Sequence, residues 1–297
     1  MASLSGKVAV VTGASRGIGR GIALVLAEQG ATVYVTGRTV TPGEYYLPGT
    51  VGETAAQCNE RGRESGGSGI AVAVDHSDDA AVAALFEQVQ REQGRLDILV
   101  NNAFQLTDDL LDSRPFFEKS LADMVMWDVG VKSNYVAAWH AARIMAPQGS
   151  GLIVAICGFA GVTYTYGPIF GTAKSAVDRM ARDMAIELQP FGVASVSLWQ
   201  GLTLTEKAEH NLKAMADKMT NTITSMTGST VEHPGRVVAA LAADPAIMQR
   251  SGGTFVTAEV AQEYGLTDVD GSVIPSAREK RGSPLWKPIA EVDYRGK

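Results

Sequence analysis

VAVVTGASRGIGRGIALVLAE, residues 8–28, is the stretch of sequence that decides the fold. Its first four residues are apolar and mostly β-branched, which is typical of a strand buried on both faces of a parallel sheet. A turn rich in glycine follows, and apolar residues then recur at helical spacing, at Ile18, Ile22, Val25 and Leu26. The stretch therefore predicts a strand, a tight turn and an amphipathic helix in direct succession.

The same alternation of short apolar runs and amphipathic segments continues along the chain. Six further runs are typical of buried strands, at residues 33–35, 70–74, 98–100, 152–156, 193–198 and 255–256. Strands that alternate with helices predict a doubly wound α/β fold with a parallel sheet of about seven strands. Because 297 residues suffice for one large core, we expect a single Rossmann-type domain over residues 1–297.

Two regions depart from this alternation. Residues 39–68 are long and rich in glycine, and they predict a surface insertion with one helix around residues 53–63. Residues 265–297 are polar, contain proline and have too few apolar residues for another core layer. They predict an extended C-terminal arm, which packs on this chain or on a neighbouring subunit.

Composition narrows the function classes. The net charge of −6 argues against a nucleic-acid partner. The two cysteines, Cys58 and Cys157, lack the spacing of a disulfide framework or a zinc site, which fits a reducing cytoplasm. No run of about 18 apolar residues predicts a membrane span, and the four histidines are too scattered to predict a metal site.

The glycine-rich turn predicts a dinucleotide site. Glycines at positions 13, 17 and 19 permit a tight turn, close approach of phosphates and close helix packing, while the helix N-terminus supplies free N–H donors. The flanking strand and helix are the context in which such a triplet is specific. The expected contacts of the dinucleotide are Gly13, Ser15, Arg16, Gly17, Ile18 and Gly19.

The end of the second predicted strand favours one dinucleotide over another. An NAD site places an acidic residue there to bind the ribose 2′-hydroxyl, but the segment VTGR carries Arg38 instead. Together with Arg16, this guanidinium is suited to clamp a 2′-phosphate through charge-assisted hydrogen bonds. The predicted cofactor is therefore NADP(H).

Joined to Asp75 and to Asn101-Asn102-Ala103, these motifs resemble the short-chain dehydrogenase/reductase superfamily, from about residue 4 to residue 271. Residues 85–103 (LFEQVQREQGRLDILVNNA), 197–199 (SLW) and 264–271 (YGLTDVDG) are similar to its dehydrogenase/reductase member-one subgroup. The resemblance implies that Asp75 meets the adenine and that Asn102 and Ala103 line the adenosine side. It also implies that Thr205 meets the nicotinamide carboxamide, and that the protein is a homodimer or a homotetramer.

The catalytic pattern of the family is altered here. The family pairs a tyrosine with a lysine four residues later, and alignment on Lys174 puts Phe170 at the tyrosine position. The resemblance leaves Lys174 to bind the ribose and to place its charge near the nicotinamide. The family serine falls at Cys157 or Gly158, and its asparagine at Gly130, with Asn134 one turn further on. Gln200-Gly201 also replaces the usual Pro-Gly.

Three replacements for the missing acid stay open. Tyr164 or Tyr166 brings a phenol into the gap, Cys157 acts as a weak donor or nucleophile, or the substrate is an iminium that needs no strong acid. We therefore expect an NADP(H)-dependent reductase of a small, largely apolar carbonyl, enone or imine, with Lys174, Tyr166 and Tyr164 as catalytic candidates. The alternatives are a catalytically silent NADP(H)-bound sensor or scaffold, and a non-redox lyase or isomerase that retains the dinucleotide.

Overall fold

The computed structural model describes residues 3–216 and 228–291. Seven parallel strands form one sheet in the order β3-β2-β1-β4-β5-β6-β7. The strands are β1 Val8–Val11, β2 Thr32–Gly37, β3 Ser68–Ala73, β4 Ile98–Asn101, β5 Gly151–Gly158, β6 Val193–Gln200 and β7 Thr254–Val256. The prediction of a doubly wound sheet of about seven strands is confirmed.

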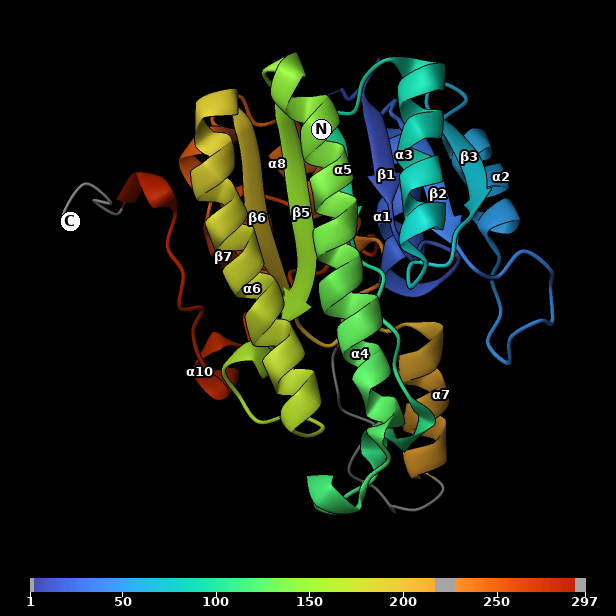
Figure 1. Cartoon of the computed structure of the whole chain (residues 1–297), viewed down its shortest axis with the longest axis vertical. Helices are drawn as coiled ribbons and strands as arrows, with labels where there is room; N and C mark the ends of the chain where they lie inside the picture. The colour runs from blue at the N-terminus through green and yellow to red at the C-terminus, as the bar shows by residue number, and fades with distance from the viewer. Residues whose placement is uncertain (1–2, 217–227, 292–297) are drawn as a thin grey trace.

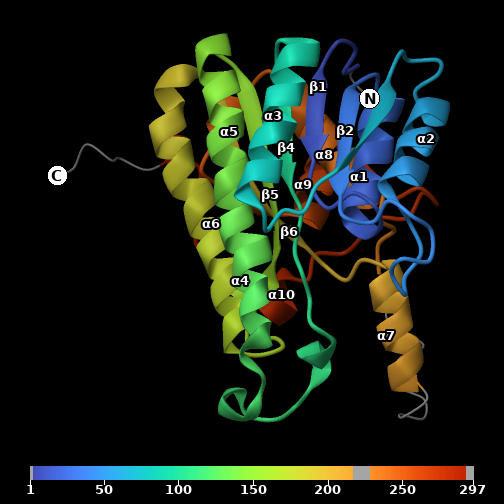
Figure 2. The same cartoon turned by 45° about the vertical axis from the view of Figure 1, so that its right-hand side comes forward.

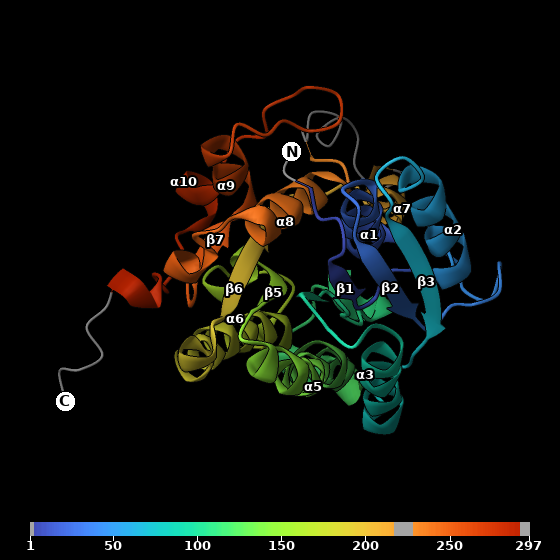
Figure 3. The same cartoon turned by 90° about the horizontal axis from the view of Figure 1, so that it is seen from above.

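Helices cover both faces of this sheet, which Figure 3 shows from above. α1, α8 and α9 pack on one face, whereas α3, α5 and α6 pack on the other. The helices are α1 Gly17–Glu28, α2 Val51–Arg61, α3 Asp79–Gln93, α4 Val125–Trp127, α5 Ser133–Gln148, α6 Pro168–Leu188, α7 Glu206–Ala216, α8 His233–Ala243, α9 Thr257–Glu263 and α10 Arg278–Arg281.

Side chains of β1 show how the two apolar layers arise. Ala9 and Val11 pack in the cluster formed with α1 and α8, whereas Val8 and Val10 pack in the cluster formed with α3 and α5. Because successive side chains of a strand point to opposite faces, an uninterrupted apolar run supplies both clusters. The sheet is therefore buried on both faces, as the sequence of its strands predicts.

All seven strands run in one direction, so their carboxyl ends meet at one edge of the sheet. Figure 1 shows this edge at the bottom, with α4 and α7 extending beyond it. In open α/β sheets, ligands bind at this edge, where the loops after the strands converge. The candidate site residues follow β1, β2, β3, β4, β5 and β6, and the topology brings them together there.

The region between β2 and β3 divides into a loop and a helix. α2 begins at Val51, two residues before the predicted start, because Thr50 and Glu53 form a reciprocal capping box. Residues 39–50 form a loop that extends toward α7 (Figure 2). The loop therefore lies beside the carboxyl edge of the sheet, and it extends toward α7 although the two are far apart in the sequence.

The described part of the C-terminal segment packs on its own chain. The Trp286 carbonyl accepts a hydrogen bond from the amide of Thr254 in β7, and the amide of Ile289 donates to Ser251. Arg182 of α6 donates to the Lys287 carbonyl. Residues 265–291 therefore cover the β7 end of the sheet, and residues 292–297 lie outside the described residues.

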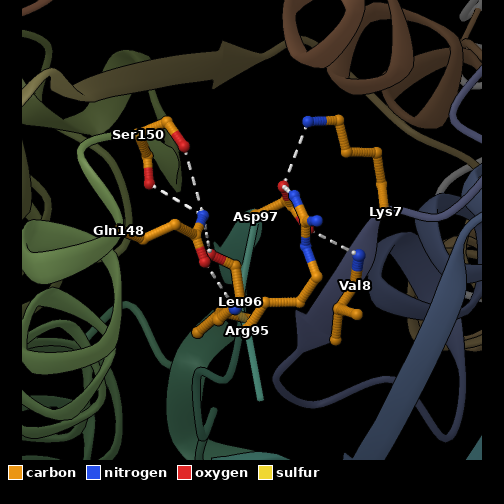
Figure 4. A network of polar contacts seen from close by, with 7 residues as sticks. All are labelled: Lys7, Val8, Arg95, Leu96, Asp97, Gln148 and Ser150. Carbon is orange, nitrogen blue, oxygen red and sulfur yellow. Dashed lines mark hydrogen bonds and ion pairs between the residues drawn. The ribbon is translucent and has the colours of Figure 1, made fainter. Parts of the chain in front are cut away.

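A buried carboxylate joins the amino-terminal ends of β1 and β4, at the edge opposite the candidate site (Figure 4). Asp97 accepts hydrogen bonds from Lys7, from the amide of Val8 at 3.0 Å and from Arg95 at 2.6 and 2.8 Å. Burial alone raises the pKa of Asp97, but the hydrogen bonds from Arg95, Val8 and Lys7 outweigh it, so the pKa is lowered. The network therefore ties two strands that are 90 residues apart.

Asp97→Asn is expected to lower the free energy of unfolding by about 2 kcal/mol at pH 7, because charged hydrogen bonds to a buried group are lost. A lowered pKa stabilises the fold above the unfolded value of about 4, and this contribution is lost as the pH falls toward the folded pKa. The difference between wild type and variant in urea unfolding should therefore shrink below about pH 4. An equal difference at pH 3 and pH 7 would contradict this assignment. The control Asp183→Asn removes an exposed ion pair with Arg179 and is expected to change little.

Candidate functional site

The turn after β1 is shaped by glycines that admit no side chain. Gly13 has φ +64°, and a Cβ there would lie 2.9 Å from Cα of Ala103. A Cβ on Gly19 would lie 2.4 Å from the Gly13 carbonyl oxygen and 2.5 Å from Nδ2 of Asn102. The turn is therefore packed directly against the end of β4, which leaves its outer side to approach a ligand.

Asn102 braces this turn. Its Nδ2 donates to the carbonyl oxygens of Thr12 and Gly13, at 2.8 and 3.0 Å. In return, the Thr12 hydroxyl accepts from the amides of Asn102 and Ala103, both at 2.9 Å. The Asn102 amide group is thus engaged with the protein backbone, and its observed role is to hold the turn in place.

The N-terminus of α1 already holds an acidic group. Oε2 of Glu206 accepts a hydrogen bond from the amide of Gly17 at 2.9 Å, and Oε1 lies 3.8 Å from the Arg20 guanidinium. Thr205 precedes it, and its hydroxyl accepts from the Ala208 amide at the start of α7. The first turn of α1 therefore binds an anionic oxygen, as free N–H groups at a helix N-terminus do.

Arg16 connects the glycine-rich turn to the loop 39–50. Its guanidinium donates to the carbonyls of Pro48 and Gly49 and to the Thr39 hydroxyl, and it lies 4.8 Å from the centre of the Tyr45 ring. The Tyr45 ring contacts that of Tyr46, whose hydroxyl accepts a hydrogen bond from Lys207 of α7. This bridge, residues Arg16, Tyr45, Tyr46 and Lys207, spans from the turn to α7.

Opposite charges gather beside the ends of β2 and β3. Arg38 is exposed, and its charge contributes to lowering the pKa of both Arg16 and Asp75. Burial is the largest influence on both pKa values: it lowers that of Arg16 and by itself raises that of Asp75. At Asp75, the hydrogen bonds from Ser77 and the charge of Arg38 outweigh burial, so its pKa is lowered. Two guanidinium groups within electrostatic range of each other suit an anion with more than one negative charge.

The two remaining residues of the predicted dinucleotide contacts serve packing in this structure. Ser15 is buried, and its carbonyl accepts from the Thr54 hydroxyl of α2. Ile18 is partly buried and packs against the core cluster beneath α1. The backbone of Ser15 and the side chain of Ile18 therefore anchor the turn to the fold.

Lys174 lies within a group of aromatic rings. Its Nζ is 3.9 Å from the ring centre of Phe104 and 5.8 Å from that of Phe170. The Phe170 ring meets the rings of Phe104 and Tyr166 edge-on, with centres 5.6 and 5.2 Å apart. Burial lowers the pKa of Lys174. The side chains of Phe104, Tyr166, Phe170 and Lys174 form the ring cluster, an apolar wall around one positive charge.

The structure separates the two candidate phenols. Tyr166 contacts the ring cluster, whereas the Tyr164 side chain is 83% exposed. Tyr166 also has φ +62°, a left-handed conformation that is uncommon for residues other than glycine and is often found at functional sites. Of the two, only Tyr166 is brought next to Phe170.

Cys157 is enclosed beneath the ring cluster. Its thiol donates to the Lys174 carbonyl at 3.3 Å, and burial raises the pKa of this thiol well above its usual value. The neighbouring Asp178 accepts from Ser197 and Trp199, while its own burial raises its pKa. These contacts favour a neutral structural thiol over a nucleophile. Gly158 ends β5 in an extended conformation.

Gly130 lies at a kink between α4 and α5, within residues Asp128–Lys132, where Val129 and Gly130 depart from helical backbone angles. A Cβ there would lie 2.6 Å from two carbon atoms of the Phe104 ring. Asn134 is buried and its carbonyl accepts from Asn101, which places it with β4. The absence of a side chain at position 130 therefore gives room to the Phe104 ring.

The chain belongs to the short chain dehydrogenase family, whose sequence model matches residues 7–216. Dehydrogenase/reductase SDR family member 1 of Homo sapiens is 40% identical over 282 residues, 91% of this chain and 85% of that protein. 1-Cyclohexenylcarbonyl-CoA reductase of Streptomyces collinus is 31% identical over 70% of each chain. A putative short-chain alcohol dehydrogenase from Sinorhizobium meliloti shares the fold with a TM-score of 0.66 and 29% identity, over 86% of this chain and 96% of that one.

Membership in this family makes the chain an oxidoreductase of a class that uses a nicotinamide dinucleotide and acts on small molecules. Within residues 3–216 and 228–291, no helix is long and apolar enough to cross a membrane. In the same described ranges, histidine, cysteine and acidic side chains form no group of three suited to a metal ion.

Sequence reasoning missed two residues of the site. Phe104 directly follows Asn101-Asn102-Ala103, so its place after the fourth predicted strand could have identified it as a candidate site residue. Glu206 directly follows Thr205, but its contact with Gly17 joins residues 189 positions apart. Only the fold reveals that second contact.

Glu206→Gln is expected to tighten NADPH binding about fivefold at low ionic strength, because a negative charge is removed from the helix N-terminus that a pyrophosphate would share. Titration of NADPH fluorescence measures the change. Glu209→Gln removes an exposed charge from the same helix and is expected to leave the dissociation constant unchanged. Weaker binding by the Glu206 variant would show that this carboxylate supports the cofactor rather than competing with it.

Proposed function

We propose that this protein is an NADP(H)-dependent reductase of a small, largely apolar carbonyl or enone compound, with an altered acid site. The observation that carries the proposal is the ring cluster, which places the Lys174 ammonium within an apolar wall at the carboxyl edge of the sheet. The relative named 1-cyclohexenylcarbonyl-CoA reductase supports an apolar unsaturated carbonyl substrate.

The residues of the turn fit the dinucleotide. Gly13, Gly17 and Gly19 leave bare backbone toward a pyrophosphate, and the amide of Gly17 already binds a carboxylate oxygen. Arg38 would bind the 2′-phosphate with Arg16 beside it, and Asp75 would meet the adenine. When bound, the nicotinamide would supply the hydride for reduction or accept it in the reverse direction.

The remaining residues would orient the cofactor and the substrate and would donate the proton. Lys174 would bind the nicotinamide ribose and place positive charge near the reacting oxygen, while Thr205 would meet the carboxamide. Tyr166 is the candidate phenol whose ring contacts Phe170, so it would donate the proton. An iminium substrate would become a neutral amine without this proton, so the cyclic imines are the second candidate class.

The proposal is tested with NADPH and a panel of cyclic ketones, cyclic enones and cyclic imines, followed by absorbance at the NADPH band. We expect turnover with at least one class. Tight NADPH binding without consumption in any of them would overturn the reductase and favour a sensor, a scaffold or a non-redox enzyme.

Arg38→Ala is expected to weaken NADPH binding by about 10- to 100-fold while NADH binding stays the same, because only NADPH carries the phosphate that this guanidinium would bind. Parallel fluorescence titrations with the two cofactors measure the effect. Arg63→Ala, which removes an exposed guanidinium beyond α2, serves as the control. Unchanged discrimination in the Arg38 variant would remove this residue from its proposed role.

We also propose a homodimer or homotetramer, which is typical of the family. The outer face of α5 carries exposed Tyr135 and Trp139 beside a shallow groove lined by Arg143 and Pro147. Exposed aromatic groups of this kind are enriched in subunit interfaces. Light scattering coupled to size-exclusion chromatography tests this, and a monomer at assay concentration would contradict it.

A further inference from the structure

The aromatic ring of Phe104 lies directly beside the Lys174 ammonium. Nζ lies 3.9 Å from the centre of this ring, within the range of a cation–π interaction. Among the residues that the structure describes, none forms a hydrogen bond or ion pair with Nζ. The Phe104 ring is therefore in direct contact with the charge of Lys174.

The surroundings of Lys174 both oppose and favour its charge. Burial disfavours the charged form of Lys174, whereas Asp178, one turn further along α6, and Cys157 of β5 favour it. Asp178 is itself occupied by hydrogen bonds from Ser197 and Trp199. The face of an aromatic ring attracts a cation electrostatically and does not need to accept a directed hydrogen bond. The N–H groups of the Lys174 ammonium therefore stay available to a ligand.

The position of the Phe104 ring depends on Gly130. A Cβ at that position would lie 2.6 Å from both Cδ2 and Cε2 of the ring, closer than carbon atoms pack. The Phe104 ring also packs nearly perpendicular to the Phe170 ring, with centres 5.6 Å apart. The ring is thus held between the kink at Gly130 and α6, with Nζ of Lys174 over it.

We propose that Phe104 is a positioning residue, which holds the Lys174 ammonium at the carboxyl edge of the sheet in a place that Gly130 keeps open. The inference rests on the proposed function for what Lys174 does with its charge. The geometry that carries it is independent of any substrate.

The test observes Lys174 directly, by NMR of the full-length protein labelled with [¹³Cε]lysine, in the absence of cofactor and substrate. Lys174→Arg identifies the signal, which the ring current of Phe104 is expected to move upfield of the other lysines. In Phe104→Leu, the signal should lose this displacement, and the pKa of Lys174 should fall by about one unit because the ring no longer stabilises the cation. Phe104→Tyr retains a ring and should keep both properties.

A second variant displaces the ring without removing it. Gly130→Ala is expected to alter the Lys174 signal while Phe104 is still present, whereas Phe86→Leu, on the far side of α5, should leave the signal in place. An unchanged Lys174 signal and pKa in folded Phe104→Leu, or an unchanged signal in folded Gly130→Ala, would overturn the inference. Neither result depends on NADPH consumption, so failure of the proposed function would be seen separately in the substrate panel.

Discussion

Phe170→Tyr is expected to raise the rate of ketone reduction by about 10²- to 10⁴-fold, the usual contribution of a positioned general acid. Position 170 lies one turn before Lys174 on α6, and its ring already belongs to the ring cluster. A hydroxyl added there would lie near the Lys174 ammonium, which favours ionisation of a phenol. The rate of NADPH consumption with a cyclic ketone, measured at saturating cofactor, gives the result.

Two further variants decide how that result is interpreted. Phe191→Tyr adds a phenol to an exposed ring and should leave the rate unchanged. Tyr166→Phe removes the phenol nearest to Phe170. If Phe170→Tyr has no effect and Tyr166→Phe abolishes turnover, Tyr166 is the acid of the native site and position 170 is only part of its wall.

Gly19→Ala is expected to weaken NADPH binding by at least about 100-fold, because its Cβ has no space between the backbone of Gly13 and the amide of Asn102. The turn must shift, and with it the donors that face the pyrophosphate. Fluorescence titration gives the affinity, and circular dichroism establishes that the fold is retained.

The matched control for this variant is Gly52→Ala. A Cβ at position 52 meets only the Thr50 hydroxyl at 3.9 Å, so alanine fits there and is the better helix former. We expect unchanged NADPH affinity and no loss of stability. Full affinity in Gly19→Ala would show that close packing of the turn on β4 is not required for cofactor binding.

The strand, turn and helix at the start of the chain were predictable because the information is local. Apolar periodicity and glycine spacing define both elements within 21 residues, and the repeat of this alternation predicts the sheet. Asn102 illustrates the limit. The resemblance predicts that it lines the adenosine side, but the local sequence does not reveal that its amide group also holds Thr12 and Gly13, a contact across about 90 residues.

The catalytic region was predicted less completely, for a similar reason. Loss of the tyrosine is visible in one residue, Phe170, but the identity of its neighbours depends on how β4, the kink at Gly130 and α6 converge. That Phe104 fills the space above Gly130 follows from tertiary packing alone. Likewise, no local pattern predicts that the loop 39–50 reaches α7 through Tyr46 and Lys207.

The contact between Gly130 and Phe104 also constrains how this protein can evolve. A side chain at position 130 displaces the ring at position 104 unless that ring becomes smaller, so the effects of the two substitutions are coupled. In a lineage that carries Phe104, a single mutation to asparagine at position 130 is expected to displace this ring. Family members with this arrangement should therefore retain the Gly130–Phe104 pair together or lose it together.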